Sequence, residues 1–170
     1  MEFIKAQRKH LDEICHITDQ AKAQLKSMGV DQWQKGYPSR QVWENDIACQ
    51  SAWIAIDNEQ VLAVFAFQTE PDPSYGEIDG EWLTDTPYAS MHRVCVSDSV
   101  KGRGVAGKMF AFGFYLAKQL GFRSVRIDTH SDNLPMQRAL LKAGFSHCGK
   151  ITLKGGCENG DTRIAFERIV

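Results

Sequence analysis

The stretch Lys101-Gly102-Arg103-Gly104-Val105-Ala106-Gly107-Lys108 carries the sharpest structural signal in this sequence. It follows a predicted strand, Tyr88 to Ser97, and opens a predicted helix, Gly104 to Leu120. Its three glycines let the backbone turn tightly and approach a ligand closely. The free N–H groups and partial positive charge at a helix start suit a pyrophosphate. With basic side chains around it, the stretch predicts a phosphate-binding loop between a strand and a helix.

Two familiar phosphate-binding motifs describe this stretch less well. A Walker loop requires Gly-Lys-Ser/Thr at a fixed spacing, which the stretch lacks. Glycines at positions 102, 104 and 107 do match the dinucleotide fingerprint Gly-x-Gly-x-x-Gly. That fingerprint normally opens a series of βαβ units with an acid about 20 residues on, whereas Asp128 lies further away and only one such unit is predicted. A protein that binds a nicotinamide dinucleotide therefore stays one alternative interpretation of this loop.

Apolar periodicity along the chain predicts both helices and strands. Before the loop we expect a strand at Glu2 to Ala6, a helix at Gln7 to Met28, and a second helix at Ser39 to about Gln50 with Ser39 as its cap. We also expect a hairpin of Ala52 to Ile56 with Val61 to Gln68 across the turn Asp57 to Gln60, and a long polar loop at Glu70 to Pro87. After it we expect a strand at Ser124 to Thr129, a helix at Asn133 to Ala143 capped by Asp132, and a hairpin of Ser146 to Leu153 with Thr162 to Ile169.

The order of these elements predicts a fold class. The strands at 88–97 and 124–129 should be parallel neighbours, joined by a right-handed crossover. The remaining strands should pair antiparallel. A length of 170 residues suits a single domain, here residues 1–170. We expect an α/β (α+β) fold with a mostly antiparallel central sheet, one parallel strand pair and flanking helices.

The loop and a second motif together resemble the GNAT N-acetyltransferase family. The loop is similar to the family signature Gln/Arg-x-x-Gly-x-Gly/Ala, with Lys101 in the first slot, where it departs from the signature but keeps the charge. The second motif is similar to Asn-x-x-(Ala/Met)-x-x-x-x-x-Lys-x-Gly-Phe, which is met by Asn133, Met136, Lys142, Gly144 and Phe145. The resemblance is specific over Tyr88 to Phe145 and looser outside it.

The resemblance implies that acetyl-coenzyme A is a co-substrate. Backbone groups of the strand would meet the pantetheine arm, the loop amides would cradle the pyrophosphate, and Asn133 would meet the cofactor where the parallel strands splay, with Met136 alongside. The implied binding residues are Val94, Cys95, Val96, Lys101, Gly102, Arg103, Gly104, Val105, Ala106, Gly107, Lys108, Asn133 and Met136. Family members transfer acetyl directly to an amine, with backbone N–H groups near Val94 and Val96 stabilising the oxyanion.

A protonated amine must lose a proton before it attacks. His92, on the strand before the loop, is a candidate base because histidine titrates near neutrality. Glu81 and Asp85 in the preceding loop are its rivals. The tyrosine that often protonates the leaving thiolate in this family is replaced by Leu140. Cys95 and Cys148 are expected to pack in the core, and neither is expected to carry the acyl group.

The acceptor amine is left open by the sequence. Trp33, Tyr37 and His130 are candidate substrate-binding residues, and acids of the loop preceding the strand would favour a cationic amine. Small molecules and peptides both remain candidates. An alternative is a non-catalytic sensor that binds acyl-coenzyme A on the same fold.

Composition limits the partners. There are 20 basic and 21 acidic side chains, so a nucleic-acid partner is not expected. No membrane partner is expected either, because no signal peptide pattern or bilayer-spanning stretch occurs. Five widely spaced cysteines, without a Cys-x-x-Cys pair or metal-ligand spacing, favour a reducing cytoplasm and no metal site. GNAT proteins are often homodimers, although no feature of the sequence shows an interface.

Overall fold

The central sheet has the mixed character that the sequence predicts. A computed structural model describes residues 1–170. Eight strands form one sheet in the order β1-β2-β3-β5-β6-β8-β7-β4, and β5 and β6 are its parallel pair. The neighbours β1–β2, β2–β3, β6–β8, β7–β8 and β4–β7 are antiparallel. The predicted fold class is confirmed.

The elements follow the predicted order, with small shifts at their ends. Their bounds are β1 Glu2–Lys5, α1 Leu11–Ser27, α2 Arg40–Ala48, β2 Ala52–Asp57, β3 Gln60–Gln68, β4 Asp79–Gly80, β5 Ala89–Val96, α3 Val105–Gln119, β6 Ser124–Thr129, α4 Leu134–Lys142, β7 Ser146–Thr152 and β8 Thr162–Ile169. Short 3₁₀ turns occur at Arg8–His10, Pro73–Tyr75 and Asp98–Val100. Ser39 caps α2 as expected, since its side chain accepts from the Val42 N–H at 3.4 Å.

The chain divides into two compact units, each made of two segments. The first contains residues 1–67 and 92–109, and the second contains residues 68–91 and 110–170. The boundaries fall inside β5 and α3, so both of these elements contribute residues to each unit. The expectation of one domain over residues 1–170 stays a prediction.

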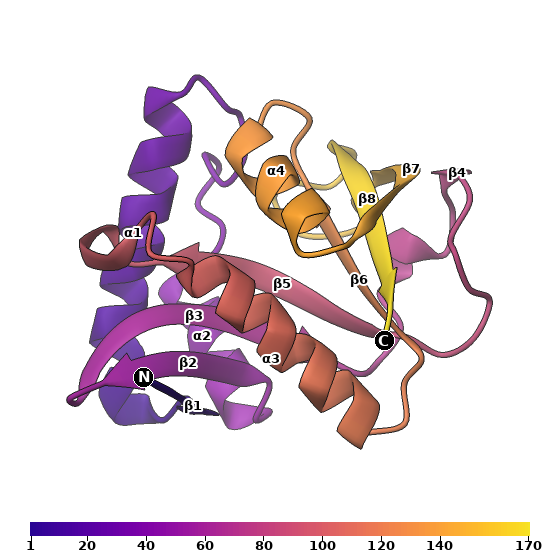
Figure 1. Cartoon of the computed structure of the whole chain (residues 1–170). Coiled ribbons are helices and arrows are strands. Elements are labelled where there is room, and N and C mark those ends of the chain that lie inside the picture. Colours follow the sequence, from indigo (N-terminus) through magenta and orange to yellow (C-terminus); the bar gives the residue numbers. More distant parts are fainter. The chain divides into compact units, whose positions relative to one another are not determined.

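The core of the first unit lies between its helices and the strands β1, β2 and β3, which Figure 1 shows beside α1 and α2. Its buried cluster consists of Ala6, Leu11, Ile14, Ile17, Trp43, Ala52, Ile54, Val61, Val64 and Cys95. The apolar stripe of α1 explains the docking of that helix, because residues at i, i+3 and i+7 share one face. The Trp43 indole N–H is satisfied by the Thr18 hydroxyl at 2.9 Å.

The second unit holds the segment that the sequence predicts to be a long polar loop. This prediction is wrong in part, because the segment forms a 3₁₀ turn at Pro73–Tyr75 and the short strand β4, which pairs with β7. The Arg126 guanidinium lies between the rings of Trp82 and Tyr88, 4.1 and 3.9 Å from their centroids. Buried aromatic and charged groups therefore fix a segment whose composition resembles that of a loop.

A buried carboxylate holds the far end of the same segment. Glu167 accepts from the Leu83 N–H at 2.6 Å, from the Thr84 hydroxyl at 2.7 Å and from Arg126 Nε at 3.2 Å. Burial alone would raise the pKa of Glu167, but its hydrogen-bond donors and the Arg126 charge lower the pKa overall. Glu167 therefore stays ionised while fully buried.

Candidate cofactor and acceptor site

The predicted phosphate loop forms a tight turn between β5 and α3. The Ser97 N–H donates to the Leu62 carbonyl at 2.8 Å, which holds the start of the turn against β3. Gly102 and Gly104 both have φ of 76°, in the left-handed region that glycine adopts without strain. The Lys108 N–H donates to the Gly104 carbonyl at 3.2 Å, as the first turn of α3 requires. The N–H groups before Lys108 therefore lack partners within the helix.

Open space lies above the glycines of this loop. A methyl group placed on Gly102, Gly104 or Gly107 would meet no atom within 4 Å. The glycines therefore leave room for a ligand beside the backbone, although the Lys101 and Arg103 N–H groups already donate to the Asp98 and Val100 carbonyls, at 3.5 and 3.2 Å. Two oxyanions of a pyrophosphate fit such a surface, because the helix start supplies N–H donors and a partial positive charge.

The cations of the loop are used in different ways. Lys101 forms an ion pair with Asp98, and its ammonium donates to the Gln24 side chain of α1. Arg103 and Lys108 are exposed, and their side chains form no ion pair or hydrogen bond. These two side chains are available to a phosphate, whereas Lys101 holds the loop to α1.

A backbone irregularity interrupts β5 just before the residues expected to meet the pantetheine arm. Arg93 has φ of 53°, which is uncommon for a residue with a side chain. Burial does not alternate along β5, because Ala89 to Met91 before the kink and Val94 and Cys95 after it are all buried. The expectation that Cys95 packs in the core is confirmed, because Cys95 belongs to the buried cluster of the first unit.

The Arg93 side chain is held from two directions at the kink. Its Nε and Nη2 form a two-pronged ion pair with the Asp46 carboxylate of α2, at 2.8 and 2.9 Å. Its Nη1 donates to the Tyr37 hydroxyl at 2.6 Å. Burial alone would lower the pKa of Arg93, but Tyr37 and Asp46 raise that pKa overall. A buried, charged guanidinium thus ties β5 to α2 and to the segment between α1 and α2.

The first unit contains four parts of the predicted site. His92 is half-buried on β5, next to Arg93, and Val94 to Val96 follow on the same strand. Tyr37 and Trp33 lie edge to face with ring centroids 6.5 Å apart. Trp33 is half-buried against the apolar core and has φ of 62°. The two candidate acceptor aromatics therefore belong to an ordered, packed turn.

The second unit brings together His130, Asn133 and Met136. The Asn133 side-chain oxygen accepts from the Met136 N–H at 3.3 Å, and the Asn133 N–H donates to the His130 carbonyl at 3.0 Å. Asn133 therefore caps α4, and the expectation that Asp132 does so is wrong. The Asp132 N–H instead donates to His130 Nδ1 at 3.1 Å.

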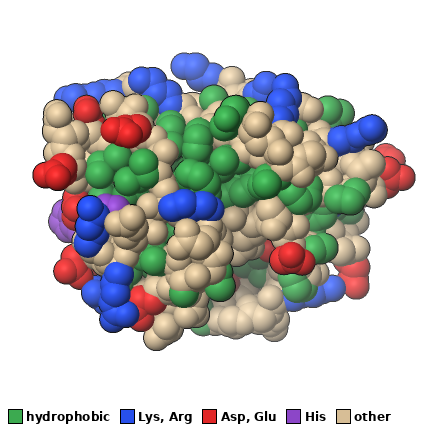
Figure 2. Space-filling model, turned by 90° about the horizontal axis from the view of Figure 1, so that it is seen from below, with side chains coloured by type: hydrophobic (Ala, Val, Ile, Leu, Met, Phe, Trp, Pro, Cys, Tyr) green, Lys and Arg blue, Asp and Glu red, His purple; other side chains and the backbone are tan.

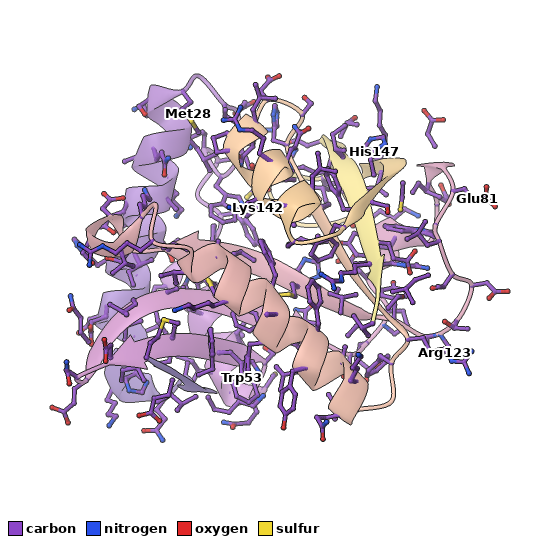
Figure 3. The ribbon with its side chains drawn as sticks, in the orientation of Figure 1. Met28, Trp53, Glu81, Arg123, Lys142 and His147 are labelled. Atoms are coloured by element: carbon purple, nitrogen blue, oxygen red, sulfur yellow. The ribbon has the colours of Figure 1, made fainter.

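Glu81 lies apart from those three residues. It follows β4 at the edge of the sheet, where its N–H donates to the Cys148 carbonyl at 2.9 Å. Figure 3 shows its exposed side chain at the outer side of that strand. His130 follows β6, three strands away in the order β6-β8-β7-β4, and three strand spacings amount to roughly 14 Å. The structure therefore does not bring Glu81 to His130.

The comparisons with known proteins decide the family. The sequence model of the acetyltransferase (GNAT) family matches residues 17–145. The chain belongs to the GNAT family of acetyltransferases. The resemblance in the glycine loop and in the Asn133 motif is thereby confirmed at the level of the family.

Individual relatives agree with this membership. A GNAT-family acetyltransferase of Streptococcus agalactiae is 32% identical, with a TM-score of 0.87 over 99% of this chain and 95% of that one. A putative acetyltransferase of Staphylococcus aureus shares the fold at 20% identity, with a TM-score of 0.74 over 99% of both chains. A streptothricin acetyltransferase of Escherichia coli is 27% identical over 131 residues, or 77% of this chain. The matched region spans 65% of the length of that curated relative.

One polar pair of this GNAT protein was not predicted from the sequence as a unit. The Tyr75 hydroxyl donates to Asp128 Oδ1 at 2.7 Å, and Tyr75 is 2% exposed. Burial, which outweighs the Tyr75 hydrogen bond and the Arg163 charge, raises the pKa of Asp128 to about 6. The signal that could have revealed it is an aspartate inside a predicted strand, Val125-Arg126-Ile127-Asp128, because aspartate is depleted in strands.

Two other features bear on the chemistry of the site. Burial raises the pKa of Cys95 to about 12, so this thiol is a poor nucleophile at neutral pH. Leu140, at the position of the family's tyrosine, is fully buried and supplies packing alone.

Figure 2 shows acidic and basic side chains interspersed on one face of the molecule. None of the helices combines the length and the apolar character needed to cross a bilayer.

Proposed function

We propose that this chain is an N-acetyltransferase that moves an acetyl group directly from acetyl-coenzyme A to a primary amine of a small molecule or peptide. The observation that carries the proposal is the loop at 101–108, whose glycines leave open space beside the backbone at the start of α3. Membership of an acetyltransferase family supports the same cofactor. Of the cations at this loop, Arg103 and Lys108 would bind phosphate, and Lys101 would hold the loop in place.

The chemistry requires a base, an oxyanion site and a leaving group. An acetyl thioester supplies an activated carbonyl carbon, to which the amine nitrogen bonds while the carbon–sulfur bond breaks. His92 would take the proton that the attacking amine loses. The N–H groups near Val94 and Val96, just after the kink at Arg93, would stabilise the developing negative charge on the carbonyl oxygen. A thiolate with a pKa near that of cysteine, about 8.5, leaves without a dedicated acid.

The acceptor would be recognised by exposed acids and by ring faces. Glu77, Asp79, Glu81 and Asp85 are all exposed along the segment before β5, and they would attract a cationic amine. The name of the Escherichia coli relative gives streptothricin as its acetyl acceptor. Trp33, Tyr37 and His130 are the side chains we propose to contact the acceptor. The five free thiols suit a reducing compartment, and we propose that the protein acts in the cytoplasm.

Titration calorimetry with acetyl-coenzyme A tests the proposal first, and a panel of amines with thiol release as the readout tests transfer. We expect saturable binding and then turnover with a cationic amine. Loss of a general base costs about 100- to 10,000-fold in turnover, so His92→Ala should lose turnover while it still binds the cofactor. Glu81→Gln tests the rival base.

His16→Ala is the matched control, because His16 is exposed on α1. It should leave both binding and turnover unchanged. Absence of binding by the folded wild-type protein would overturn the proposed cofactor. Full turnover by His92→Ala would remove His92 as the base and leave the transferase assignment standing.

A further inference from the structure

We infer that Arg93 is a positioning residue that sets the backbone of the cofactor strand and couples it to the turn carrying Trp33 and Tyr37. This inference rests on the proposed function, since it assumes that Val94 to Val96 meet an acyl-coenzyme A. The Arg93 guanidinium contacts Asp46 and Tyr37, so its role is to position other groups.

Arg93 has an unfavourable backbone conformation. A φ of 53° in a strand is unfavourable for a residue with a Cβ, and it persists only where the surroundings over-determine it. The surroundings here are three charge-assisted hydrogen bonds, and the side chains of Arg93 and Asp46 are 8% and 10% exposed. These hydrogen bonds hold the kink, and the kink sets the orientation of the amides of the next residues along the strand.

The partners of the Arg93 side chain lie on two other parts of the first unit. Asp46 lies near the end of α2 and also accepts from the Ser51 hydroxyl at 3.2 Å. Tyr37 belongs to the turn between α1 and α2, and its ring packs edge-on against Trp33. One guanidinium therefore joins the strand expected to bind the cofactor with the aromatic pair expected to bind the acceptor.

The turn between α1 and α2 also has hydrogen bonds with α1. Lys22 of α1 donates to the Pro38 carbonyl at 2.6 Å, and the Gln34 side chain donates to the Lys22 carbonyl at 3.1 Å. These contacts attach the turn to α1, whereas the contact from Arg93 attaches it to β5. Trp33 of the turn also packs on the core cluster that contains Cys95. Without Arg93 we therefore expect the turn to stay attached to α1 and to this core while it loses its polar link to β5.

The experiment separates backbone conformation from side-chain coupling by comparing two variants. In both, Asp46→Asn accompanies the change so that no buried carboxylate is left unpaired. Arg93→Gly keeps access to the left-handed region, and Arg93→Ala does not. Acetyl-coenzyme A affinity is measured by calorimetry, and amide hydrogen exchange of residues 31–38 and 94–97 is measured without ligand.

We expect the glycine variant to bind acetyl-coenzyme A within about threefold of wild type, and the alanine variant to lose about tenfold or more in affinity. In both variants the amides of residues 31–38 should exchange about tenfold faster. Tyr37→Phe removes one of the three hydrogen bonds of Arg93 and should also speed exchange in the turn. Arg40→Ala, which removes an exposed arginine of α2, is the matched control and should change neither readout.

Two results would overturn the inference. An alanine variant that binds acetyl-coenzyme A as tightly as the wild type would show that the kink does not depend on Arg93. Unchanged exchange of residues 31–38 in all variants would show that no coupling exists. If the wild type itself fails to bind acetyl-coenzyme A, the proposed function fails, while the exchange measurements still decide the coupling.

Discussion

Positive φ angles occur at Gly104 and at Arg93, and different physical causes permit them. At Gly104 no side chain clashes with the backbone, so the conformation follows from the residue type. At Arg93 a residue with a Cβ bears a cost of about 1–2 kcal/mol, which the bonds to Asp46 and Tyr37 offset. The first case can be predicted from the sequence, and the second depends on a carboxylate 47 residues away.

The change Gly104→Asp should abolish cofactor binding while the protein stays folded. Open space surrounds this position, and aspartate is among the residues that tolerate the left-handed region. A carboxylate beside a pyrophosphate would repel it by about 1–4 kcal/mol at a surface site, which corresponds to roughly 10- to 1,000-fold in affinity. Calorimetry with acetyl-coenzyme A and circular dichroism measure the two properties.

Gly104→Asn is the matched control, because it has the same shape without the charge. It should weaken binding much less than the aspartate does. Equal losses in the two variants would mean that shape alone matters at Gly104, and unchanged affinity in both would place the phosphates elsewhere.

At the scale of elements, the pairing of β4 with β7 depends on two facing glycines. Gly80 and Gly149 are partners in this ladder, with φ of 141° and 145°. A Cβ on Gly149 would lie 2.2 Å from the Asp79 carbonyl oxygen, and one on Gly80 would lie 2.2 Å from the Cys148 carbonyl oxygen. The backbones approach so closely that neither position admits a side chain. The strand β4 therefore exists because of this crossing, and its own two residues carry no strand signal.

Gly149→Ala should therefore destabilise the protein by about 1–3 kcal/mol or more, because strain in φ and a backbone clash act together. Thermal or chemical unfolding measures the loss. Gly121→Ala is the control, since Gly121 also has a positive φ but open space around it, so that only the conformational cost remains. Equal losses in the two variants would contradict a specific clash at the β4–β7 crossing.

At the scale of the whole molecule, Asp128 links stability to pH. Its pKa is raised from 3.8 to about 6 by burial. The folded protein therefore keeps this proton at a pH where the unfolded chain has lost it. Stability falls as pH rises from about 4 to about 6 and the cost is constant above that range. The Tyr75 hydrogen bond and the Arg163 charge reduce the cost without cancelling it.

Asp128→Asn should remove this dependence, because an amide does not ionise and still accepts from Tyr75. The stability advantage of the variant over wild type should grow by about 1–2 kcal/mol between about pH 4.5 and about pH 8. Urea unfolding of both proteins at the two pH values measures it. A constant difference would show that Asp128 titrates normally in the folded protein.

Local signals predicted most of the secondary structure and the cofactor loop. The hairpin turn at Asn58 and Glu59, the cap at Ser39 and the glycines of the loop all follow from residues within a few positions of one another. The wrong prediction of the α4 cap shows where such local signals fail. Asp132 and Asn133 are equally good caps by residue type, and the choice between them depends on the chain direction after His130.

By itself, the sequence determined the order of helices and strands, the parallel pair, the phosphate loop and the GNAT family, because periodicity, glycine and helix starts act over short distances. Only the tertiary structure decided the kink at Arg93, the strand β4 and the buried pairs Arg126–Glu167 and Tyr75–Asp128. These features arise where distant residues exclude water together. Burial then strengthens hydrogen bonds and charge interactions, and no local sequence pattern predicts this change in strength.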